Sequence, residues 1–246
     1  MRTRPLGLKL GVFLFALLTS LSSVQGQLRR IPRFWEVGAG LYGSNYSGDL
    51  APDHISFSNT RFGASLFLRY HWSPTFQLRS QLNYVQLAGD DRLHPPNANR
   101  SFRFTSNTIE TMGSLELSLV NIAYDPPGGS HTYYFSPYIF AGVGIAFSAP
   151  KVVYYGPPSE RYRFEREPIP EGGRAQQTVG IFPFGVGMRL IASDFVALGL
   201  EACARPAPSD LVDGVSRNGN PKRKDWYYTA GLTVSYFLNG PWYLKN

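Results

Sequence analysis

The sequence contains few of the residues on which metal centres, disulfide scaffolds and helical membrane proteins depend. It has one cysteine, Cys203, so no intramolecular disulfide can form, and its four histidines show no metal-ligand spacing. Charged residues make up only 17% of the chain. The longest apolar run, 10–21, falls short of the ~20 residues of a transmembrane helix. The sequence therefore argues against all three classes, and no metal or cofactor is expected.

The first 26 residues have the layout of a secretory signal peptide. Three basic residues precede the apolar run 10–21, and residues 24–26 (VQG) form a small-x-small cleavage site. We expect residues 1–26 to be removed and residues 27–246 to form one exported domain. Loss of the three basic residues would lower the net charge from +7 to +4, so nucleic acid is not expected as a partner.

The rest of the chain has the composition and periodicity of strands. Aromatic residues reach 15% and there are 25 glycines, which suits strands better than helices. Apolar residues recur at every second position, opposite a small or polar face. We therefore expect an all-β chain. The eight predicted strands are 35–42, 62–72, 76–84, 109–119, 138–147, 182–189, 196–203 and 226–236.

One face of the predicted strands is suited to lipid. It is apolar in the middle and aromatic at its ends, with Tyr70 and Trp72 on one strand and Trp226 and Tyr236 on another. Aromatic girdles around an apolar band are typical of a barrel in a membrane. We predict an eight-stranded antiparallel transmembrane β-barrel of the outer-membrane type. Its expected location is the outer membrane of a Gram-negative bacterium, with the lipid bilayer as partner.

The predicted connections alternate in length, as they do in bacterial barrels, which have short periplasmic turns and long outer loops. Segment 124–136 is a periplasmic turn that is longer than usual. The short turns are 73–75 and 192–194, and the long polar loops are 48–60, 89–107, 149–176 and 205–224.

Three glycines, Gly38, Gly40 and Gly43, spell G-x-G-x-x-G, the pattern of a dinucleotide-binding turn. That pattern has meaning only where a strand runs into the glycines and a helix follows them. Residues 44–49 (SNYSGD) contain no helix former. We therefore assign Gly38 and Gly40 to the lumen face of the first strand, where large side chains would not fit.

The second face of the strands combines small residues with charges. Ions inside a narrow barrel need partners, because an unpaired charge is costly to desolvate. We predict a network of ion pairs that fills the lumen, with a conducting path as the alternative, although eight strands leave an interior about filled by side chains. The predicted network consists of Glu36, Arg69, Arg79, Glu110, Glu116, Arg189 and Glu201.

No catalytic constellation is visible in the sequence. Two histidines fall in outer loops, His71 at a strand end and His131 in a periplasmic turn, and none shares a strand with a serine at nucleophile–base spacing. Asp90 and Asp91 could imitate an acidic pair but are more simply the solvated start of a loop. We therefore expect that the chain is not an enzyme.

Two features allow more than one interpretation. Cys203 is either a small lumen-facing residue beside Glu201 or a thiol that cross-links to a partner, since an odd cysteine can pair between molecules. Segment 151–174 mixes arginine and glutamate with tyrosine and phenylalanine. It is either an ordinary outer loop or a lobe that binds a ligand or a surface.

Five stretches, which cover nearly all of residues 27–246 in order, carry a family resemblance. They are EVGAGLYGSNYSGDLAP, RFGASLFLRYHWSPTFQLRSQLNYVQLAGDD, FSPYIFAGVGIAFSAP, FPFGVGMRLIASDFVALGLE and GNPKRKDWYYTAGLTVSYF. Together they resemble the small outer-membrane barrels related to PorG, a component of the type IX secretion system. The stretch LEACARPAPSD departs from the longer aromatic strand of that family, so the outer end of the seventh strand is left open.

The resemblance implies association with a periplasmic ring of PorK and PorN type and a role in protein secretion or gliding. It brings no catalytic or ligand residues. On that basis we expect a non-enzymatic assembly or anchoring subunit, whose periplasmic contacts would lie in segment 124–136 and in the tail 239–246, with Trp242 and Tyr243 as anchors. The alternative is a self-contained surface barrel whose outer loops mediate adhesion or ligand binding.

Overall fold

The computed structural model describes residues 33–47, 59–93, 101–119, 122–124, 133–157, 176–193, 195–208 and 225–238. One short 3-10 helix, Asp91–Leu93, lies wholly within these ranges. None of the described residues forms a helix that is long and apolar enough to cross a membrane. The expected signal peptide, 1–26, lies outside the described residues and stays a prediction.

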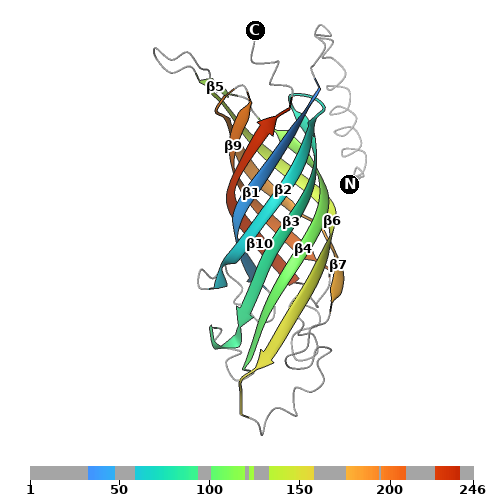
Figure 1. The fold of residues 1–246 in the computed structure, drawn as a ribbon, viewed down its shortest axis with the longest axis vertical. Helices are drawn as coiled ribbons and strands as arrows, with labels where there is room; N and C mark the ends of the chain where they lie inside the picture. The colour runs from blue at the N-terminus through green and yellow to red at the C-terminus, as the bar shows by residue number, and fades with distance from the viewer. Residues whose placement is uncertain are drawn as a thin grey trace, which may run out of the picture. The chain divides into compact units, whose positions relative to one another are not determined.

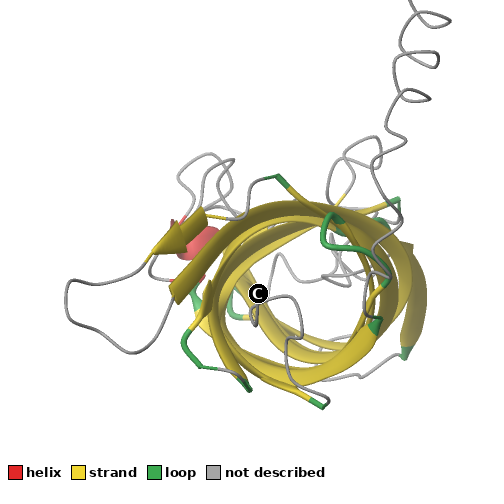
Figure 2. Cartoon of the chain, turned by 90° about the horizontal axis from the view of Figure 1, so that it is seen from above, coloured by secondary structure: helices red, strands yellow, loops and turns green. Residues whose placement is uncertain are grey.

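The strands pair edge to edge in a closed antiparallel ring (Figures 1 and 2). The first strand pairs with the second on one side and with the last on the other, which closes the ring. The predicted fold class is confirmed. The strands are β1 (Phe34–Ser47), β2 (Arg61–His71), β3 (Phe76–Asp90), β4 (Phe102–Ser118), β5 (Ile122–Tyr124), β6 (Tyr133–Tyr154), β7 (Gln177–Ile181), β8 (Phe184–Ile191), β9 (Val196–Ala207) and β10 (Asp225–Phe237).

Two of these strands, β7 and β8, belong to one crossing of the barrel. β7 pairs with residues 144–148 of β6, and β8 pairs with residues 134–141 of the same strand. The break falls at Pro183, which has no backbone N–H to donate to the ladder. Its carbonyl oxygen instead accepts a hydrogen bond from the backbone nitrogen of Gly142 at 2.8 Å. Since β5 only extends the pairing of β6 by three residues, the predicted strands correspond to the crossings of the ring.

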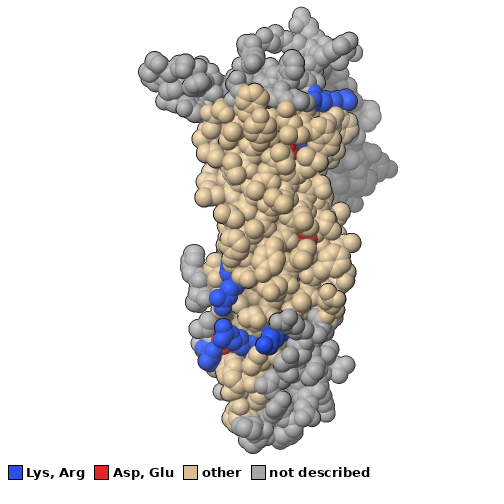
Figure 3. Space-filling view, in the orientation of Figure 1, with Lys and Arg blue, Asp and Glu red and all other residues tan. Residues whose placement is uncertain are grey.

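The middle of the barrel exterior is apolar, and Figure 3 shows almost no charged side chains over it. Leu41, Leu66 and Leu232 are exposed by 61%, 63% and 64%. Trp35 and Trp72, exposed by 43% and 54%, lie at the end that carries the short turn between β2 and β3. A closed barrel with an apolar, aromatic-edged exterior is a transmembrane barrel, because lipid solvates such a surface and water does not. The chain is therefore an outer-membrane β-barrel, as predicted.

Three strands continue past the apolar band at the outer end, opposite the short turns (Figure 1). β3 ends at Asp90, β4 begins at Phe102 and β6 runs to Tyr154. The predicted loops 89–107 and 149–176 were therefore too long, since each includes strand residues. We call the parts of β3, β4 and β6 beyond the apolar band the outer extension.

The apolar positions change face where the outer extension begins. On β4, Ile109 points outward and is 52% exposed, whereas Phe104 points inward and is fully buried. On β6 the same change separates Phe147, 47% exposed, from Val152, which is buried. The apolar band faces lipid on its outside and ions on its inside. The extension has an apolar interior and an exterior that is mostly polar, with Val153 as an exposed exception. A sequence reading that kept one phase of alternation throughout could not recognise the extension as strand.

Candidate functional site

Buried ion pairs fill the barrel interior near its periplasmic end. Glu116 on β4 is central: one carboxylate oxygen is 2.9 Å from Nε of Arg69 and 2.9 Å from Nη2 of Arg189. The other oxygen is 3.0 Å from Nε of Arg79. These four side chains are at most 6% exposed. Three strands, β2, β3 and β8, thus each direct a guanidinium group at one carboxylate on a fourth.

Two more carboxylates balance the charge. Glu36 on β1 pairs with Arg69, and Glu201 on β9 pairs with Arg79. Glu201 also accepts a hydrogen bond from the hydroxyl of Tyr138 at 3.0 Å. The cluster therefore contains three carboxylates and three guanidinium groups, so it is formally neutral. We call it the basal ion cluster: Glu36, Arg69, Arg79, Glu116, Arg189 and Glu201.

A second buried pair lies farther toward the outer end. Nε of Arg205 is 3.0 Å from Oε2 of Glu110. Glu110 also accepts hydrogen bonds from the hydroxyl of Tyr227 at 2.5 Å and from Nδ2 of Asn83 at 3.0 Å. Every residue of this group is at most 2% exposed. The arrangement gives this buried carboxylate one cation and two hydrogen-bond donors, because a charge without water needs such partners.

The structure thus places all seven predicted lumen residues inside the barrel, each with a charged partner, and adds Arg205, which the sequence reading missed. The predicted outer loop 205–224 includes Arg205, but β9 continues through Pro206 to Ala207, so the seventh predicted strand ends there. The signal was present in the sequence. Arg205 has the same alternation phase as Glu201 and Cys203, and the predicted network had four glutamates for three arginines.

The periplasmic end of the interior is closed by apolar side chains. Phe34, Ile191, Ala197 and Phe237 form a buried cluster there. The ring of His71 stacks on Phe34 with centroids 4.1 Å apart, and its Nε2 lies 2.6 Å from Oε2 of Glu36. His71, expected only at a strand end, therefore joins the apolar closure to the basal ion cluster.

The outer end of the interior holds a larger apolar cluster, which the sequence reading did not foresee. The rings of Tyr46 and Phe104 meet edge to face with centroids 4.9 Å apart, and those of Phe102 and Tyr154 are 5.4 Å apart. We call this cluster the outer apolar core: Tyr46, Val85, Leu87, Phe102, Phe104, Ala146, Val152, Tyr154, Val179, Ile181, Ala207 and Tyr227. With the ion pairs below it, this core fills the barrel as a soluble protein fills its interior.

Polar contacts hold the strand ends of the outer extension together. Asp90, the last residue of β3, pairs with Nη2 of Arg92 at 2.7 Å and accepts a hydrogen bond from the hydroxyl of Tyr155 at 3.0 Å. Arg92 lies over the Tyr155 ring at 4.5 Å, and the backbone nitrogen of Tyr155 donates to Ser101 at 3.0 Å. Hydrogen bonds from Arg92 lower the pKa of Asp90 to about 2. We call Asp90, Arg92 and Tyr155 the rim clamp.

The neighbouring Asp91 is fully buried, and its Oδ2 accepts a hydrogen bond from the backbone nitrogen of Phe102 at 3.0 Å. Asp90 and Asp91 are therefore not the solvated start of a loop. Asp91 ties the end of β3 to the start of β4, and Asp90 ties it to Tyr155, which follows β6. Their bonding to neighbouring groups also argues against an acidic pair available for chemistry.

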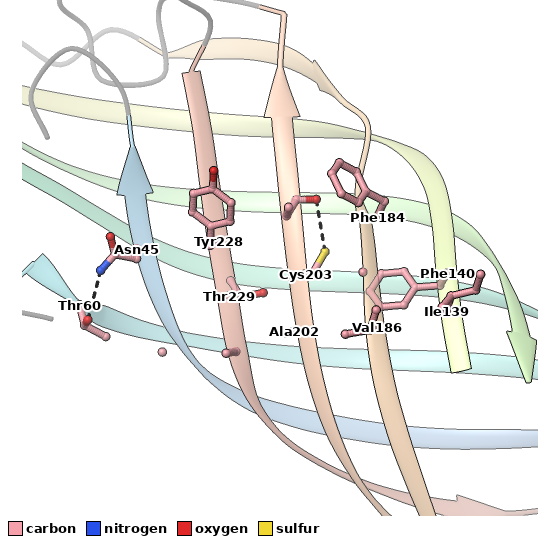
Figure 4. Close-up of a pocket in the computed structure, with 14 residues that line it drawn as sticks. Asn45, Thr60, Ile139, Phe140, Phe184, Val186, Ala202, Cys203, Tyr228 and Thr229 are labelled. Atoms are coloured by element: carbon pink, nitrogen blue, oxygen red, sulfur yellow. Dashed lines mark hydrogen bonds between the residues drawn. The ribbon is translucent and has the colours of Figure 1, made fainter. Parts of the chain in front are cut away.

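The other predicted contact residues are only partly described. Cys203 is 3% exposed, and its thiol lies 3.7 Å from the backbone oxygen of Ala204 (Figure 4). Trp242 and Tyr243 lie outside the described residues, as does most of segment 151–174. Segment 124–136 contributes Tyr124 to β5 and its last four residues to β6, so the predicted turn is shorter than expected.

A hollow of about 640 Å³ lies in the barrel wall (Figure 4). Its floor is formed by small residues on three adjacent strands, where Ala230 pairs with both Gly43 and Ala202. Phe184 and Tyr228 stand at its edge. The lining is mostly apolar, so the hollow can accommodate apolar groups, and the one thiol in its lining, Cys203, is 3% exposed.

A family model described as "Domain of unknown function (DUF6089)" matches residues 9–246. The chain belongs to the DUF6089 family. Among curated proteins, no sequence matches it.

Solved structures with similar folds are outer-membrane barrels. Neisserial surface protein A is 12% identical, with a TM-score of 0.45 over 82% of this chain and 96% of that one. Ail, the attachment invasion locus protein of Yersinia pestis, is 10% identical, with a TM-score of 0.42 over 83% and 99%. The outer membrane protease OmpT of Escherichia coli is 8% identical, with a TM-score of 0.35 over 84% and 96%. Likenesses this distant carry no information on activity.

The described part of this DUF6089 chain contains no group of three histidine, cysteine or acidic side chains that could hold a metal ion. Its interior carboxylates are each occupied by a guanidinium group or by hydroxyl and amide donors. The one described histidine, His71, is buried against Glu36. What the arrangement can do is hold a rigid barrel in the membrane and present its two ends.

Proposed function

We propose that this DUF6089 barrel is a non-enzymatic anchoring subunit, which holds partner proteins at the outer membrane. The observation that carries the proposal is the packing of the interior. Ion pairs fill its middle, and apolar side chains close both ends. A barrel packed in this way has its working surfaces at the ends rather than along a central path.

The resemblance to PorG-like barrels suggests which partners are involved. They would be periplasmic ring proteins of PorK and PorN type, and the assembly would serve type IX secretion or gliding. β10 ends at Phe237 beside the short turns, so we expect the tail 239–246 to begin at the periplasmic end. β5 ends at Tyr124 and β6 begins at Tyr133 at the same end, so we expect segment 125–132 to lie there too. These two segments are the proposed docking elements.

Gentle detergent extraction of the tagged barrel from its native outer membrane, followed by mass spectrometry, tests this proposal. Wild type should recover a periplasmic lipoprotein and its partner. Deletion of 239–246 together with 125–132 should lose them, whereas an eight-residue deletion in the outer loop, 160–167, should not. Recovery of the same partners by the doubly deleted barrel would contradict periplasmic docking.

A second candidate function is recognition at the cell surface, and the outer extension favours it. Its strands share the outer apolar core with β1, β7, β9 and β10 and are joined by the rim clamp, so they form a firm base for the outer loops. Replacement of outer loop residues 160–172 by a glycine–serine linker would test this function. Loss of binding to cells or polysaccharide, with secretion intact, would favour surface recognition over anchoring.

A further inference from the structure

The outer extension carries a small basic surface on the outward face of β4 and β6. Arg103 and Lys151 are exposed there, next to the exposed side chains of Thr105 and Asn107. Thr105 is paired with Lys151 in the ladder, and Asn107 with Ala149. Figure 3 shows lysine and arginine gathered at this end of the barrel. We call Arg103, Thr105, Asn107 and Lys151 the basic rim patch.

The patch has the shape and donors of a small anion site. Thr105, Asn107, Ala149 and Lys151 line a depression of about 80 Å³. Arg103 lies two residues from Thr105 on the same face, so its Cα is diagonal to that of Lys151, at roughly 7–8 Å. Long cationic side chains at this separation can approach one group together. An ammonium, a guanidinium, a hydroxyl and an amide are the donors that phosphate oxygens accept.

The positive charge of the patch is not neutralised by the protein. Among the described residues, neither Arg103 nor Lys151 has an ion-pair partner. The nearest acid in the ladder is Asp90, which is paired with Arg103 across β3 and β4. Asp90 is already engaged by Arg92 and Tyr155 in the rim clamp. Two cations therefore remain available to an outside ligand.

The position of the patch indicates what that ligand is. On β6 the apolar band ends at Phe147, and Lys151 follows four residues later, about 13 Å along the strand. With the usual tilt of 35–45°, this is about 10 Å along the membrane normal. A lysine side chain can extend back toward the membrane while its apolar stem lies on the wall. The patch therefore faces the headgroup layer of the outer leaflet.

We propose that the basic rim patch binds the phosphate of an outer-leaflet lipid headgroup. Arg103 and Lys151 supply the charge, and Thr105 and Asn107 supply directional hydrogen bonds. The site goes beyond the proposed anchoring function, since it concerns the membrane and not a protein partner. A lipid held at this point would fix the rotation of the barrel relative to its immediate lipid neighbours.

Native mass spectrometry of the full barrel in detergent, titrated with phosphorylated lipid A, tests the proposal. The probe is compared with dephosphorylated lipid A, and the variants are Arg103→Gln, Lys151→Gln and the double variant. Each lost cation should weaken binding of the phosphorylated lipid about fivefold, and the double variant about 25-fold. Arg33→Gln, which removes an exposed cation before β1, is the matched control and should leave binding unchanged.

Three results would overturn the proposal. Equal binding of phosphorylated and dephosphorylated lipid would show that the acyl chains are recognised and not the phosphate. An equal loss in Arg33→Gln would show that only net charge matters. Displacement of the lipid by millimolar inorganic phosphate would show a site for a free anion and not for a headgroup. Heat-modifiable gel mobility of every variant shows whether the barrel is folded.

Discussion

Glu116 offers the sharpest test of the ion pairs inside the barrel, because three guanidinium groups contact its carboxylate. Glu116→Gln keeps the shape of the side chain and removes one negative charge. The basal ion cluster then has two carboxylates for three guanidinium groups, and arginine cannot release its proton to compensate. Breaking a buried ion pair in this way typically costs about 3–5 kcal/mol. We expect the free energy of unfolding to fall by that amount.

The charge-balanced double variant separates charge from packing. Glu116→Gln combined with Arg189→Met restores neutrality and leaves the pairs of Glu36 and Glu201 in place, so it should recover at least half of the loss. Ser114→Ala is the control, because its hydroxyl is buried on the same strand without a hydrogen-bond partner. Urea titrations of the barrel folded in vesicles, followed by tryptophan fluorescence, give the three values. A loss below about 1 kcal/mol for Glu116→Gln, or simple additivity in the double variant, would refute the reasoning.

Three further predictions follow from the other layers. Phe104→Ala should lower the free energy of unfolding by about 3–5 kcal/mol in the same urea assay, because it leaves a cavity in the outer apolar core. The lipid-facing control Phe147→Ala should lower it far less. Equal losses in the two variants would contradict the stabilising role of the outer apolar core. The pKa of Asp90 is lowered from 3.8 to about 2, so the stabilisation that the rim clamp provides is complete above about pH 4 and is lost as the pH falls through 2. Tyr155 fluorescence, read in a background with the other tyrosines assigned, should show this transition in wild type and not in Asp90→Asn. Planar-bilayer recordings should show no stable conductance, and regular steps in the wild type would contradict the filled interior.

The sequence predicted the membrane-spanning part of the fold well, because one rule governs it. Between the girdles, apolar residues face lipid and charged residues face inward, so period-two alternation identified the strands and the lumen residues such as Glu116 and Arg79. The partners of each ion could not be predicted, since they depend on the stagger between strands. Glu201 meets Arg79 across the barrel interior, from strands far apart in the chain.

The outer end was harder to predict because it obeys the opposite rule. Phe102 and Phe104 alternate with Arg103 and Thr105 as in a soluble barrel, and the sequence alone gives no reason to expect the change of phase. The proline in ARPAPSD had a similar effect at the end of β9. Pro206 pairs with Trp226 of β10, and its carbonyl oxygen accepts a hydrogen bond from the backbone nitrogen of Phe182 beside the break between β7 and β8. The strand and Arg205 therefore continue where a loop was expected.

The change of phase also determines how deeply the barrel sits in the membrane. Sliding inward by a few residues would carry Lys151 and Arg103 toward the hydrocarbon, where a cation costs up to about 2–4 kcal/mol at the bilayer midplane and about 0–1 near the interface. Sliding outward would expose Ile109 and Phe147 to water, at roughly 1.5–3 kcal/mol for each side chain. Both displacements cost free energy, so the apolar band and the polar extension together fix the depth of the barrel in the membrane. At that depth the ion pairs lie within the membrane and the basic rim patch lies at the headgroups.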